Sequence, residues 1–277
     1  MKRLFLILLA TSCLCSCRSV VFEDRTECPK FLFLNVTNPE RFSSYDKVYN
    51  AVFRYPNGGQ IAADQPKLRE IQDLSYYVEV RKTEAVKGYG LIGWGGLTQN
   101  VDDWVVPTGM QADTLYRYSY TVDMDDEMKI VPVEFYKEHC KVTVQFVGYE
   151  TFSHAQGRFP FDIVVRSNSC GINAFTGLPV RGDFQYRPVE TSTGRFEFTL
   201  LRQINSDLTM DLYGRKALVE DDGYYRTFDL YKMIAERSDI TWNEKNLPDL
   251  YIEIDFVAAT AYIQVDYWNE NSLHFDL

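Results

Sequence analysis

The chain has 277 residues, of which 45% are hydrophobic and 15% aromatic, and this is enough to build one large or two ordinary packed domains. Its formal net charge is −10 and it has no basic run, which argues against nucleic acid as a partner and against binding an anionic membrane surface by charge. No low-complexity segment or helical repeat interrupts the sequence.

The N-terminus has the pattern of a lipoprotein export signal. Lys2 and Arg3 provide a positive start, and the apolar run over residues 4–10 is too short to span a bilayer. The sequence LCSC over residues 14–17 then has the form of a bacterial lipobox, with leucine three residues before Cys17 and small residues between them. We expect a peptidase to cleave before Cys17 and the thiol to form a thioether with diacylglycerol.

Two alternatives to this lipobox are weaker. A lipobox ending at Cys13 would place Ala10 where leucine is preferred, and the other alternative is an ordinary cleaved signal. We therefore predict a signal peptide over residues 1–16 and a lipidated tether over residues 17–30. Each acyl CH₂ buried in a membrane contributes about 0.8 kcal/mol, so two or more chains hold stably where one does not. The mature chain would be tied to a membrane by its end, without a transmembrane helix.

Three cysteines follow the lipobox, namely Cys28, Cys140 and Cys170. An odd number in an exported protein allows one disulfide and one free thiol, or no disulfide, and the sequence does not choose among the pairings. The chain has three histidines and no CxxC pair after the signal, so a structural zinc site is not expected. We expect neither a metal nor another cofactor.

Alternation with a period of two residues dominates the first half of the chain and is typical of strands. The sequence PNGG at residues 56–59 follows one such run, and its Asn-Gly pair can adopt positive φ, so a hairpin turn is expected there. Residues 64–74 fit either a short helix or a loop, and residues 123–127 form an acidic turn. Strands are expected at residues 31–36, 47–55, 74–80, 89–94 and 115–120.

A second set of alternating runs begins at Cys140. In the first of these runs, Val142, Val144 and Phe146 fall on one face, as expected for a strand with one buried side. Strands are expected at residues 140–147, 161–165, 195–200, 208–212, 251–256 and 262–268.

The best helix pattern lies at residues 227–237, where Asp229 can cap the N-terminus and the side chains at 230, 233 and 234 share one face. Elsewhere, short strands separated by turn signals are typical of β-sandwiches. We predict an all-β fold of two sandwiches, over residues 31–138 and 139–277, with one or two short helices.

Two motifs match functional patterns by letter only. Residues 88–93 read GxGxxG, but the segment WGGLT at 94–98 cannot easily start the helix that a dinucleotide site needs, so we interpret these glycines as part of a strand. The acidic residues at 123–127 offer carboxylates for calcium but lack the glycine and the distal glutamate of an EF-hand loop. A solvated acidic turn is the favoured interpretation.

The dipeptide His139-Cys140 has the residue types of a Cys–His nucleophile. Neighbouring residues on a strand point to opposite faces, so His139 cannot easily activate Cys140, and we expect a structural cysteine beside an exposed histidine. The chain lacks GxSxG, HExxH and P-loop motifs, while paired acids for glycoside hydrolysis stay open because their separation is spatial. We expect no enzymatic activity.

The chain contains 19 tyrosines and 4 tryptophans. Exposed aromatic side chains could form a platform that binds glycans, whereas aromatic residues in strands more often belong to the core or to cross-strand pairs. We favour the core and keep a glycan-binding surface lipoprotein as the alternative function. The tryptophans are Trp94, Trp104, Trp242 and Trp268.

Several stretches, taken in their order and spacing, resemble one family. They are Cys17 with residues 19–24 and Cys28-Pro29, residues 52–59 (VFRYPNGG), Gly88-Tyr89 with residues 94–97 (WGGL), residues 184–188 (FQYRP), residues 199–202 (TLLR) and residues 263–268 (IQVDYW). The family is that of the FimB-type fimbrial anchor lipoproteins of Bacteroidia, and the resemblance covers nearly all of the mature chain.

The resemblance implies two tandem transthyretin-like Greek-key sandwiches in a surface-exposed outer-membrane lipoprotein that anchors a fimbrium and limits its growth. Its partners would be fimbrial (pilin) subunits, with the lipid bilayer holding Cys17. Subunits of such fimbriae join by strand donation, in which an extended segment completes the sheet of the next subunit. They are usually processed at an arginine; Arg18 and Arg25 lie in the tether, and an anchor does not obviously need the cut. Which strand forms the joint stays open.

Overall fold

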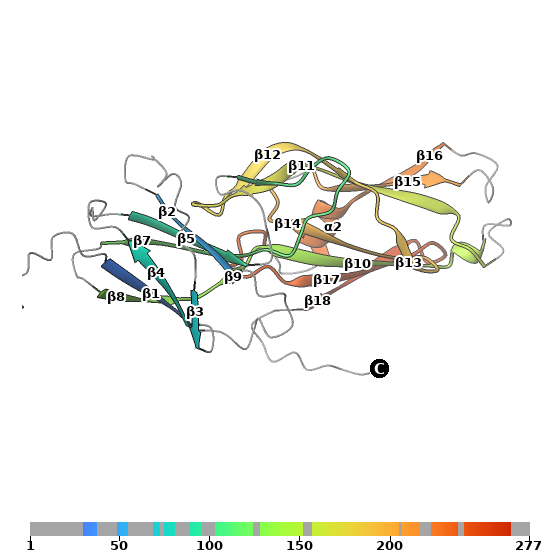
Figure 1. Cartoon of the computed structure of the whole chain (residues 1–277). Helices are drawn as coiled ribbons and strands as arrows, with labels where there is room; N and C mark the ends of the chain where they lie inside the picture. Colours follow the sequence, from blue (N-terminus) through green and yellow to red (C-terminus); the bar gives the residue numbers. More distant parts are fainter. Residues whose placement is uncertain are drawn as a thin grey trace, which may run out of the picture.

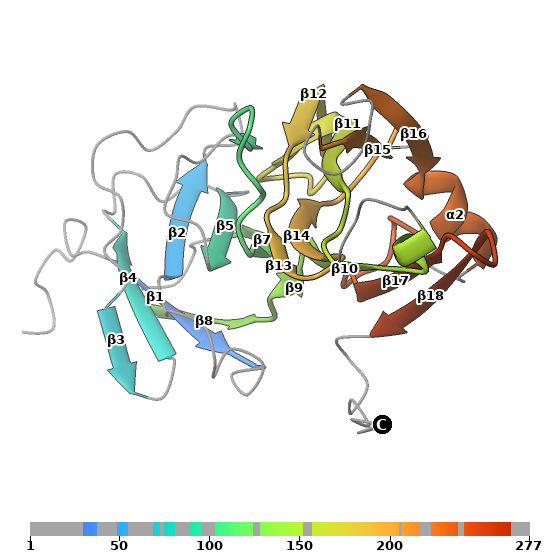
Figure 2. The same ribbon diagram turned by 90° about the vertical axis from the view of Figure 1, so that its right-hand side faces the viewer.

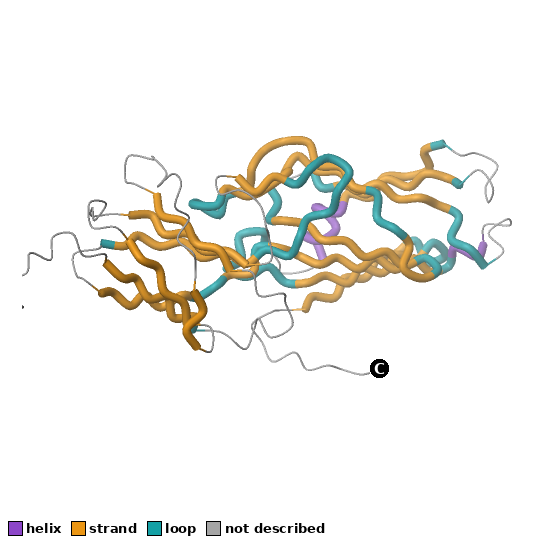
Figure 3. The backbone as a smooth tube through the Cα atoms, viewed as in Figure 1, coloured by secondary structure: helices purple, strands orange, loops and turns teal. Residues whose placement is uncertain are grey.

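A computed structural model describes residues 30–37, 49–54, 69–72, 75–80, 89–95, 103–123, 128–151, 157–204, 207–215, 223–237 and 241–266. Strands dominate these residues, and one short α-helix accompanies them (Figure 3). The predicted all-β class is therefore confirmed. Most strands of the first half gather at one end of an elongated molecule, and the strands of the second half gather at the other (Figure 1).

The N-terminal sandwich is formed by two four-stranded sheets. Its strands are β1 (Lys30–Val36), β2 (Tyr49–Arg54), β3 (Arg69–Gln72), β4 (Ser75–Val80), β5 (Tyr89–Gly95), β7 (Tyr116–Val122), β8 (Met128–Val133) and β9 (Tyr136–Lys137). One sheet has the order β3-β4-β1-β8 and the other the order β2-β5-β7-β9. Tyr118 of β7 joins the two sheets, because its ring lies 6.5 Å from that of Phe135 and its hydroxyl donates to the Pro132 carbonyl of β8 at 3.4 Å.

One local prediction for this sandwich lies outside the described residues, and another is wrong. The hairpin turn predicted at residues 56–59 is not described; β2, which precedes it, pairs with β5, and the next described strand, β3, belongs to the other sheet. Residues 69–72, predicted as part of a helix or a loop, form β3, because they pair with β4 and gain backbone hydrogen bonds from it.

The C-terminal sandwich is formed by two further sheets. Its strands are β10 (His139–Val147), β11 (Phe161–Asn173), β12 (Pro179–Tyr186), β13 (Glu190–Ser192), β14 (Arg195–Leu201), β15 (Thr209–Gly214), β16 (Tyr224–Asp229), β17 (Asp249–Asp255) and β18 (Thr260–Asp266). The sheet orders are β13-β14-β10-β17-β18 and β12-β11-β15-β16. β10 therefore lies in the centre of its sheet, with β14 antiparallel on one side and β17 parallel on the other.

The core of the C-terminal sandwich lies between these two sheets. Val142, Val144 and Phe146 of β10 are all buried, as their alternation predicts, and they pack in one cluster with apolar side chains of β11 and β15. The ring of Phe146 stacks on that of Phe159 at a centroid distance of 4.7 Å. Burial of such side chains, at roughly 25 cal/mol per Å² of apolar surface, is the main contribution that holds the two sheets together.

The helix α2 spans Leu230–Arg237 and follows directly after β16. The predicted cap is confirmed, because the Asp229 carboxylate accepts a hydrogen bond from the Lys232 N–H at 2.8 Å. The predicted start at Thr227 is wrong, because residues 227–229 complete a strand whose pairing with β15 supplies backbone hydrogen bonds that a first helical turn would lack.

One strand of the first half belongs to a sheet of the second half. β6 (Asp103–Val105) pairs antiparallel with the end of β11, with Trp104 opposite Ile172. The predicted boundaries at residues 31–138 and 139–277 thus remain predictions, and β6 crosses them. Within the part of the chain that is described, no helix combines the length and the apolar character that membrane crossing requires.

Candidate functional site at the junction of the two sandwiches

The predicted lipidation site, Cys17, lies outside the described residues, and so do Arg18, Arg25 and Cys28. The structure does describe Cys140 and Cys170, and both thiols are free and buried in the C-terminal sandwich. Any disulfide among the three cysteines after the lipobox would use at least one of these two. The structure therefore favours the alternative without a disulfide.

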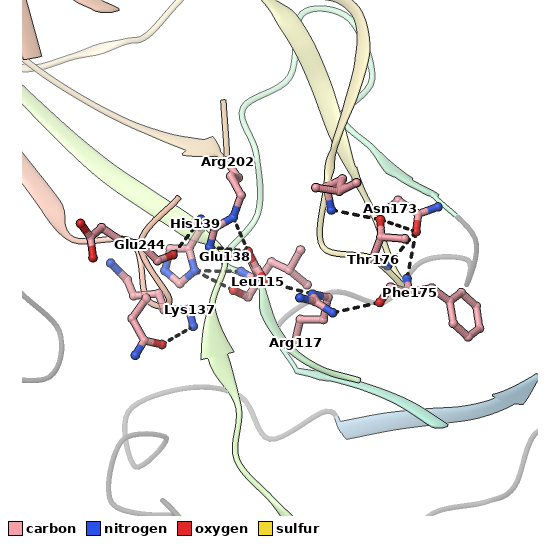
Figure 4. A network of polar contacts seen from close by, with 12 residues as sticks. Leu115, Arg117, Lys137, Glu138, His139, Asn173, Phe175, Thr176, Arg202 and Glu244 are labelled. Atoms are coloured by element: carbon pink, nitrogen blue, oxygen red, sulfur yellow. Dashed lines mark hydrogen bonds and ion pairs between the residues drawn. The ribbon is translucent and has the colours of Figure 1, made fainter. Parts of the chain in front are cut away.

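A network of buried polar side chains lies where the chain passes from β9 to β10. β9 ends at Lys137 and β10 begins at His139, so Glu138 alone connects a strand of one sandwich to a strand of the other. We call residues 137–139 the junction (Figure 4). All three side chains are buried, and each makes polar contacts with a different part of the chain.

The Glu138 carboxylate lies between two guanidinium groups. Its Oε1 accepts from Arg117 Nε at 2.9 Å, and its Oε2 accepts from Arg202 Nε at 2.8 Å. Arg117 belongs to β7 of the N-terminal sandwich, and Arg202 follows β14 of the C-terminal sandwich, so one carboxylate joins the two (Figure 4). Glu138 is only 2% exposed, and charge-assisted hydrogen bonds of this kind are stronger than neutral ones where water is excluded.

Arg202 connects Glu138 to the segment between α2 and β17. Its Nη1 donates to the carbonyl of Trp242 at 2.5 Å and to that of Glu244 at 2.8 Å. The guanidinium thus satisfies two backbone acceptors of a segment that has no sheet partner at these residues, as well as the buried carboxylate.

Arg117 connects Glu138 to the turn between β11 and β12. Its Nη1 donates to the Phe175 carbonyl at 3.4 Å, and Gly177 lies beneath the guanidinium with φ of +67°. A Cβ at Gly177 would lie 2.1 Å from Arg117 Nη2. Glycine at this position therefore permits both the left-handed backbone and the close approach of the arginine.

Lys137 fastens the other side of the junction to the C-terminal sandwich. Its Nζ donates to the Leu247 carbonyl at 3.0 Å and to Asp249 Oδ1 at 2.5 Å, and its backbone N–H donates to Asn246 Oδ1 at 3.0 Å. Leu247 returns a backbone hydrogen bond to the Lys137 carbonyl at 2.9 Å. A buried ammonium that is paired in this way avoids the large cost of an isolated charge.

His139 corrects the prediction of an exposed histidine, because it is 0% exposed. Its Nδ1 lies 3.0 Å from both the N–H and the carbonyl oxygen of Leu115, so it accepts from the N–H in one tautomer and donates to the carbonyl in the other. Its ring meets the Tyr116 ring edge to face at 5.1 Å. Burial, with a smaller contribution from Lys137, lowers the pKa of His139 to about 3, so the imidazole is neutral.

Cys140 is buried in the core of the C-terminal sandwich, while His139 contacts β7 and its neighbours in the N-terminal sandwich. This separation is the one that strand alternation predicts. Burial raises the pKa of the Cys140 thiol, which disfavours the thiolate that a nucleophile needs. The two side chains do not form a nucleophile and base.

A segment of the first half also packs on the C-terminal sandwich, and we call residues 103–112 the strap. After β6, the Val106 N–H donates to the Cys170 carbonyl at 2.8 Å, and the Ala112 N–H donates to the Thr199 carbonyl at 3.3 Å. A Cβ at Gly171 would lie 2.4 Å from the Trp104 carbonyl oxygen, so only glycine allows β6 to come this close. The strap and Leu115, the residue before β7, share a buried cluster with residues of the C-terminal sandwich; its members are Trp104, Ala112, Leu115, Ile172, Ala174 and Leu201.

The tryptophans do not form the platform that glycan binding would need, as far as they are described. Trp104 is 3% exposed and Trp242 is 8% exposed, so both belong to buried packing. The side chains of Trp94 and Trp268 lie outside the described residues. The GxGxxG segment falls on β5, which agrees with glycines in a strand, and residues 124–127 of the acidic turn are not described.

The arrangement at the junction is suited to holding segments together. Its contacts join β7, the β11–β12 turn and the segment before β17 to residues 137–139. Among the residues that the structure describes, no group of three or more histidine, cysteine or acidic side chains lies close enough to hold a metal ion. Sequence reasoning missed Arg117, Glu138 and Arg202 as a set; Arg117 and Arg202 each follow apolar or aromatic residues, but Glu138 lies between Lys137 and His139, so no shared local signal marks the three.

Comparison with solved structures relates this fold to a fimbrial anchor protein and to candidate polysaccharide-binding and cell-adhesion proteins. The fimbrial anchor protein Mfa2 from Porphyromonas gingivalis matches with a TM-score of 0.54 and 15% identity, over 86% of this chain and 97% of Mfa2. A candidate polysaccharide-binding protein from Bacteroides thetaiotaomicron matches with a TM-score of 0.54 and 12% identity, over 87% of this chain and 97% of that protein.

A candidate cell-adhesion protein from Bacteroides uniformis matches with a TM-score of 0.51 and 10% identity, over 87% of this chain and 98% of that protein. Neither a family model nor a curated protein matches the sequence. The identities are low, and the likeness is one of fold. The chain thus has the two-sandwich fold of a fimbrial anchor protein and of candidate adhesion proteins of Bacteroides, over nearly the whole of each.

Proposed function

We propose that the protein is a FimB-type outer-membrane lipoprotein that anchors a fimbrium to the cell surface and limits its length. In this proposal acyl chains on Cys17 hold the N-terminus in the membrane, and the two sandwiches hold a fimbrial subunit. The protein acts by binding, without catalysis.

The observation that carries the proposal is the fold shared with Mfa2 over 86% of this chain, taken together with the lipobox at residues 14–17. A lipobox alone would fit many surface lipoproteins, and the fold alone would fit an adhesin. Only residues 18–29 separate Cys17 from the start of β1 at Lys30, so the tether in this proposal is short in sequence.

The proposed joint is β-strand complementation, in which a segment of one subunit adds to a sheet of the other. β8 offers a suitable edge, because it ends its sheet among the described strands and its Met128 and Ile130 are 59% and 64% exposed. Apolar side chains on an unpaired edge are a liability for a protein that has no partner there. A pilin strand laid against β8 would cover them.

A glycan-binding surface lipoprotein is the second candidate, and the likeness to a candidate polysaccharide-binding protein favours it. Because Trp104 and Trp242 are buried, they argue against glycan binding through these two tryptophans. A glycan array probed with the purified protein separates the two candidates, because an anchor needs no glycan.

The test of anchoring is the variant Cys17→Ala in the native organism. We expect fimbriae to be released into the medium or to change in length, as measured by electron microscopy and by pilin content in cell and medium fractions. Mass spectrometry of the wild-type protein should find acyl chains on Cys17.

The matched control is Cys28→Ala, which changes a cysteine of the same tether outside the lipobox. Its fimbriae should stay on the cells at wild-type length. Cell-bound fimbriae of normal length in the Cys17→Ala strain, or an unmodified N-terminus in the wild type, would overturn the proposal.

A further inference from the structure

The strand that enters the fold from the tether is paired along both sides. β1 has six residue pairs with β4, from Lys30 opposite Val80 to Asn35 opposite Ser75. It has six more with β8, which runs parallel to it. A pull on the tether therefore acts first on a strand that is held in the interior of a sheet.

The direction of β8 decides how that pull is resisted. In the parallel pair, Phe31 lies opposite Met128 and Val36 lies opposite Val133, so the N-terminal ends of both strands lie together. Beyond Val133 the chain continues through β9 into β10, the central strand of a C-terminal sheet (Figure 2). The C-terminal sandwich therefore pulls on the C-terminal end of β8, while the tether pulls on the N-terminal end of β1.

We propose that the parallel β1/β8 ladder is a mechanical clamp that carries tension between the tether and the C-terminal sandwich. Forces applied at opposite ends of two parallel strands slide one strand along the other, so the evenly spaced ladder hydrogen bonds share the load and must break together. Forces applied at the same end would open the bonds one after another. The biological use of the clamp rests on the proposed anchoring function, in which the load of a fimbrial subunit bound at β8 would also reach the tether through the β1/β8 ladder.

The contacts of the junction determine where a force on the C-terminal sandwich reaches the chain that leads to β8. Glu138 and Lys137 are held by Arg202, Leu247 and Asp249, all in the C-terminal sandwich. Because Lys137 and Glu138 are both bound to the C-terminal sandwich, a force on that sandwich is transmitted to residues 137–139. From there it is transmitted through β9 to β8.

Single-molecule force spectroscopy on the full chain tests the clamp. One handle is attached at Lys141→Cys, an exposed position at the start of β10, and the other at Cys28, just before β1. In the comparison chain the second handle is moved to Thr37→Cys, an exposed position just after β1, with Cys28→Ser. Serine replaces Cys13, Cys15 and Cys17 in both chains, and Cys140 and Cys170 are buried, so each chain presents one reactive thiol at each attachment site.

The two chains have the same sandwiches and differ only in which end of β1 is pulled. At the same loading rate we expect a higher unfolding force for the N-terminal sandwich from Cys28 than from Thr37, because forced unfolding follows the unfolding rate along the pulled direction. An equal or lower force from Cys28 would overturn the clamp. A higher force from Cys28, together with fimbriae that stay on Cys17→Ala cells, would support the mechanical clamp and contradict the proposed anchoring function.

Discussion

At the junction and its ion-pair partners, Arg117, Arg202 and Lys137 face Glu138 and Asp249, so positive charge exceeds negative charge there. Glu138→Gln would keep the shape of the side chain and leave two largely buried guanidinium groups without a carboxylate. Removing one partner of a buried ion pair costs about 3–5 kcal/mol, and we expect a loss of about 3 kcal/mol in the free energy of unfolding because glutamine keeps one acceptor. Denaturant unfolding followed by tryptophan fluorescence measures it.

The control for this prediction is Glu197→Gln, since Glu197 pairs with Arg195 on the surface of β14. Both side chains of that pair are exposed, and an exposed pair contributes little, so the change should stay within about 0.5 kcal/mol. A Glu138→Gln variant as stable as the Glu197→Gln variant would mean that the buried network contributes no net stability.

His139 predicts a dependence of stability on pH. Its pKa is lowered to about 3 by burial, with Lys137 adding to the effect, whereas the unfolded chain binds the proton near pH 6.5. The contribution of His139 to the free energy of unfolding is therefore complete above pH 6.5 and is lost as the pH falls from there toward 3. We expect this residue to cost about 2–3 kcal/mol of the free energy of unfolding between about pH 7 and about pH 4.5.

Protonation of acidic residues also lowers the free energy of unfolding in this pH interval. The measurement is therefore a comparison of the wild type with His139→Gln. Glutamine can accept the Leu115 N–H bond but does not titrate. The wild type should lose more stability than the variant between the two pH values. The same loss in both proteins would contradict a buried neutral histidine.

The sequence predicted some of these residues and not others, for a physical reason. Strand alternation was sufficient to place His139 and Cys140 on opposite sides. The burial of His139 was not predictable, because its cover comes from Leu115 and Tyr116, more than twenty positions earlier in the chain. The same holds for Glu138, whose two arginines are brought to it by separate strands.

Among the elements, the turn between β11 and β12 supports the junction through Gly177. Alanine there would strain a backbone with φ of +67° and also displace the Arg117 guanidinium. Gly157 has a similar φ of +74° with nothing within 4 Å of a Cβ, so Gly157→Ala measures the strain alone. We expect about 1 kcal/mol of destabilisation for Gly157→Ala and about 2 kcal/mol more for Gly177→Ala, by chemical denaturation. Equal effects would mean that Arg117 moves aside without cost.

The exposed edge of β8 predicts where a pilin strand binds. Ile130→Lys places a charge on the outward side of the edge strand, which is a common protection against strand addition. We expect copurification of the pilin to be lost while the melting temperature stays unchanged, because Ile130 is exposed in this protein.

The matched control for the edge is Leu178→Lys, which adds the same charge at an equally exposed apolar residue in the β11–β12 turn. Pilin should copurify with this variant as with the wild type. If Ile130→Lys also retained the pilin, the joint would lie at another strand.

The elements that sequence reasoning found are those with a clean alternation, such as β10, β14, β17 and β18. β8 was missed because Pro132 interrupts its pattern, and β6 was missed because three residues carry no periodicity. The pairing of β6 depends on Gly171, which lies on β11, far along the chain. The helix start was placed three residues early for a similar reason, since the partner of residues 227–229 is β15.

At the scale of the molecule, spacing and turn signals were enough to predict two sandwiches, because each strand run has its own local pattern. They could not predict the order of strands within a sheet. The parallel pairs β1/β8 and β10/β17 join segments that are about a hundred residues apart, and no local feature marks them. The crossing of β6 into the second sandwich is of the same kind.

The strap and the junction together predict that the two sandwiches unfold as one unit. The strap buries Trp104 and Ala112 against Ile172 and Leu201, so opening the C-terminal sandwich exposes apolar surface of the first half as well. Calorimetry of the wild type should therefore show one transition. Gly171→Ala should separate it into two, because a Cβ there cannot coexist with the Trp104 carbonyl and the strap must leave. Two transitions in the wild type, or one unchanged transition in the variant, would mean that the sandwiches are coupled only through the covalent chain.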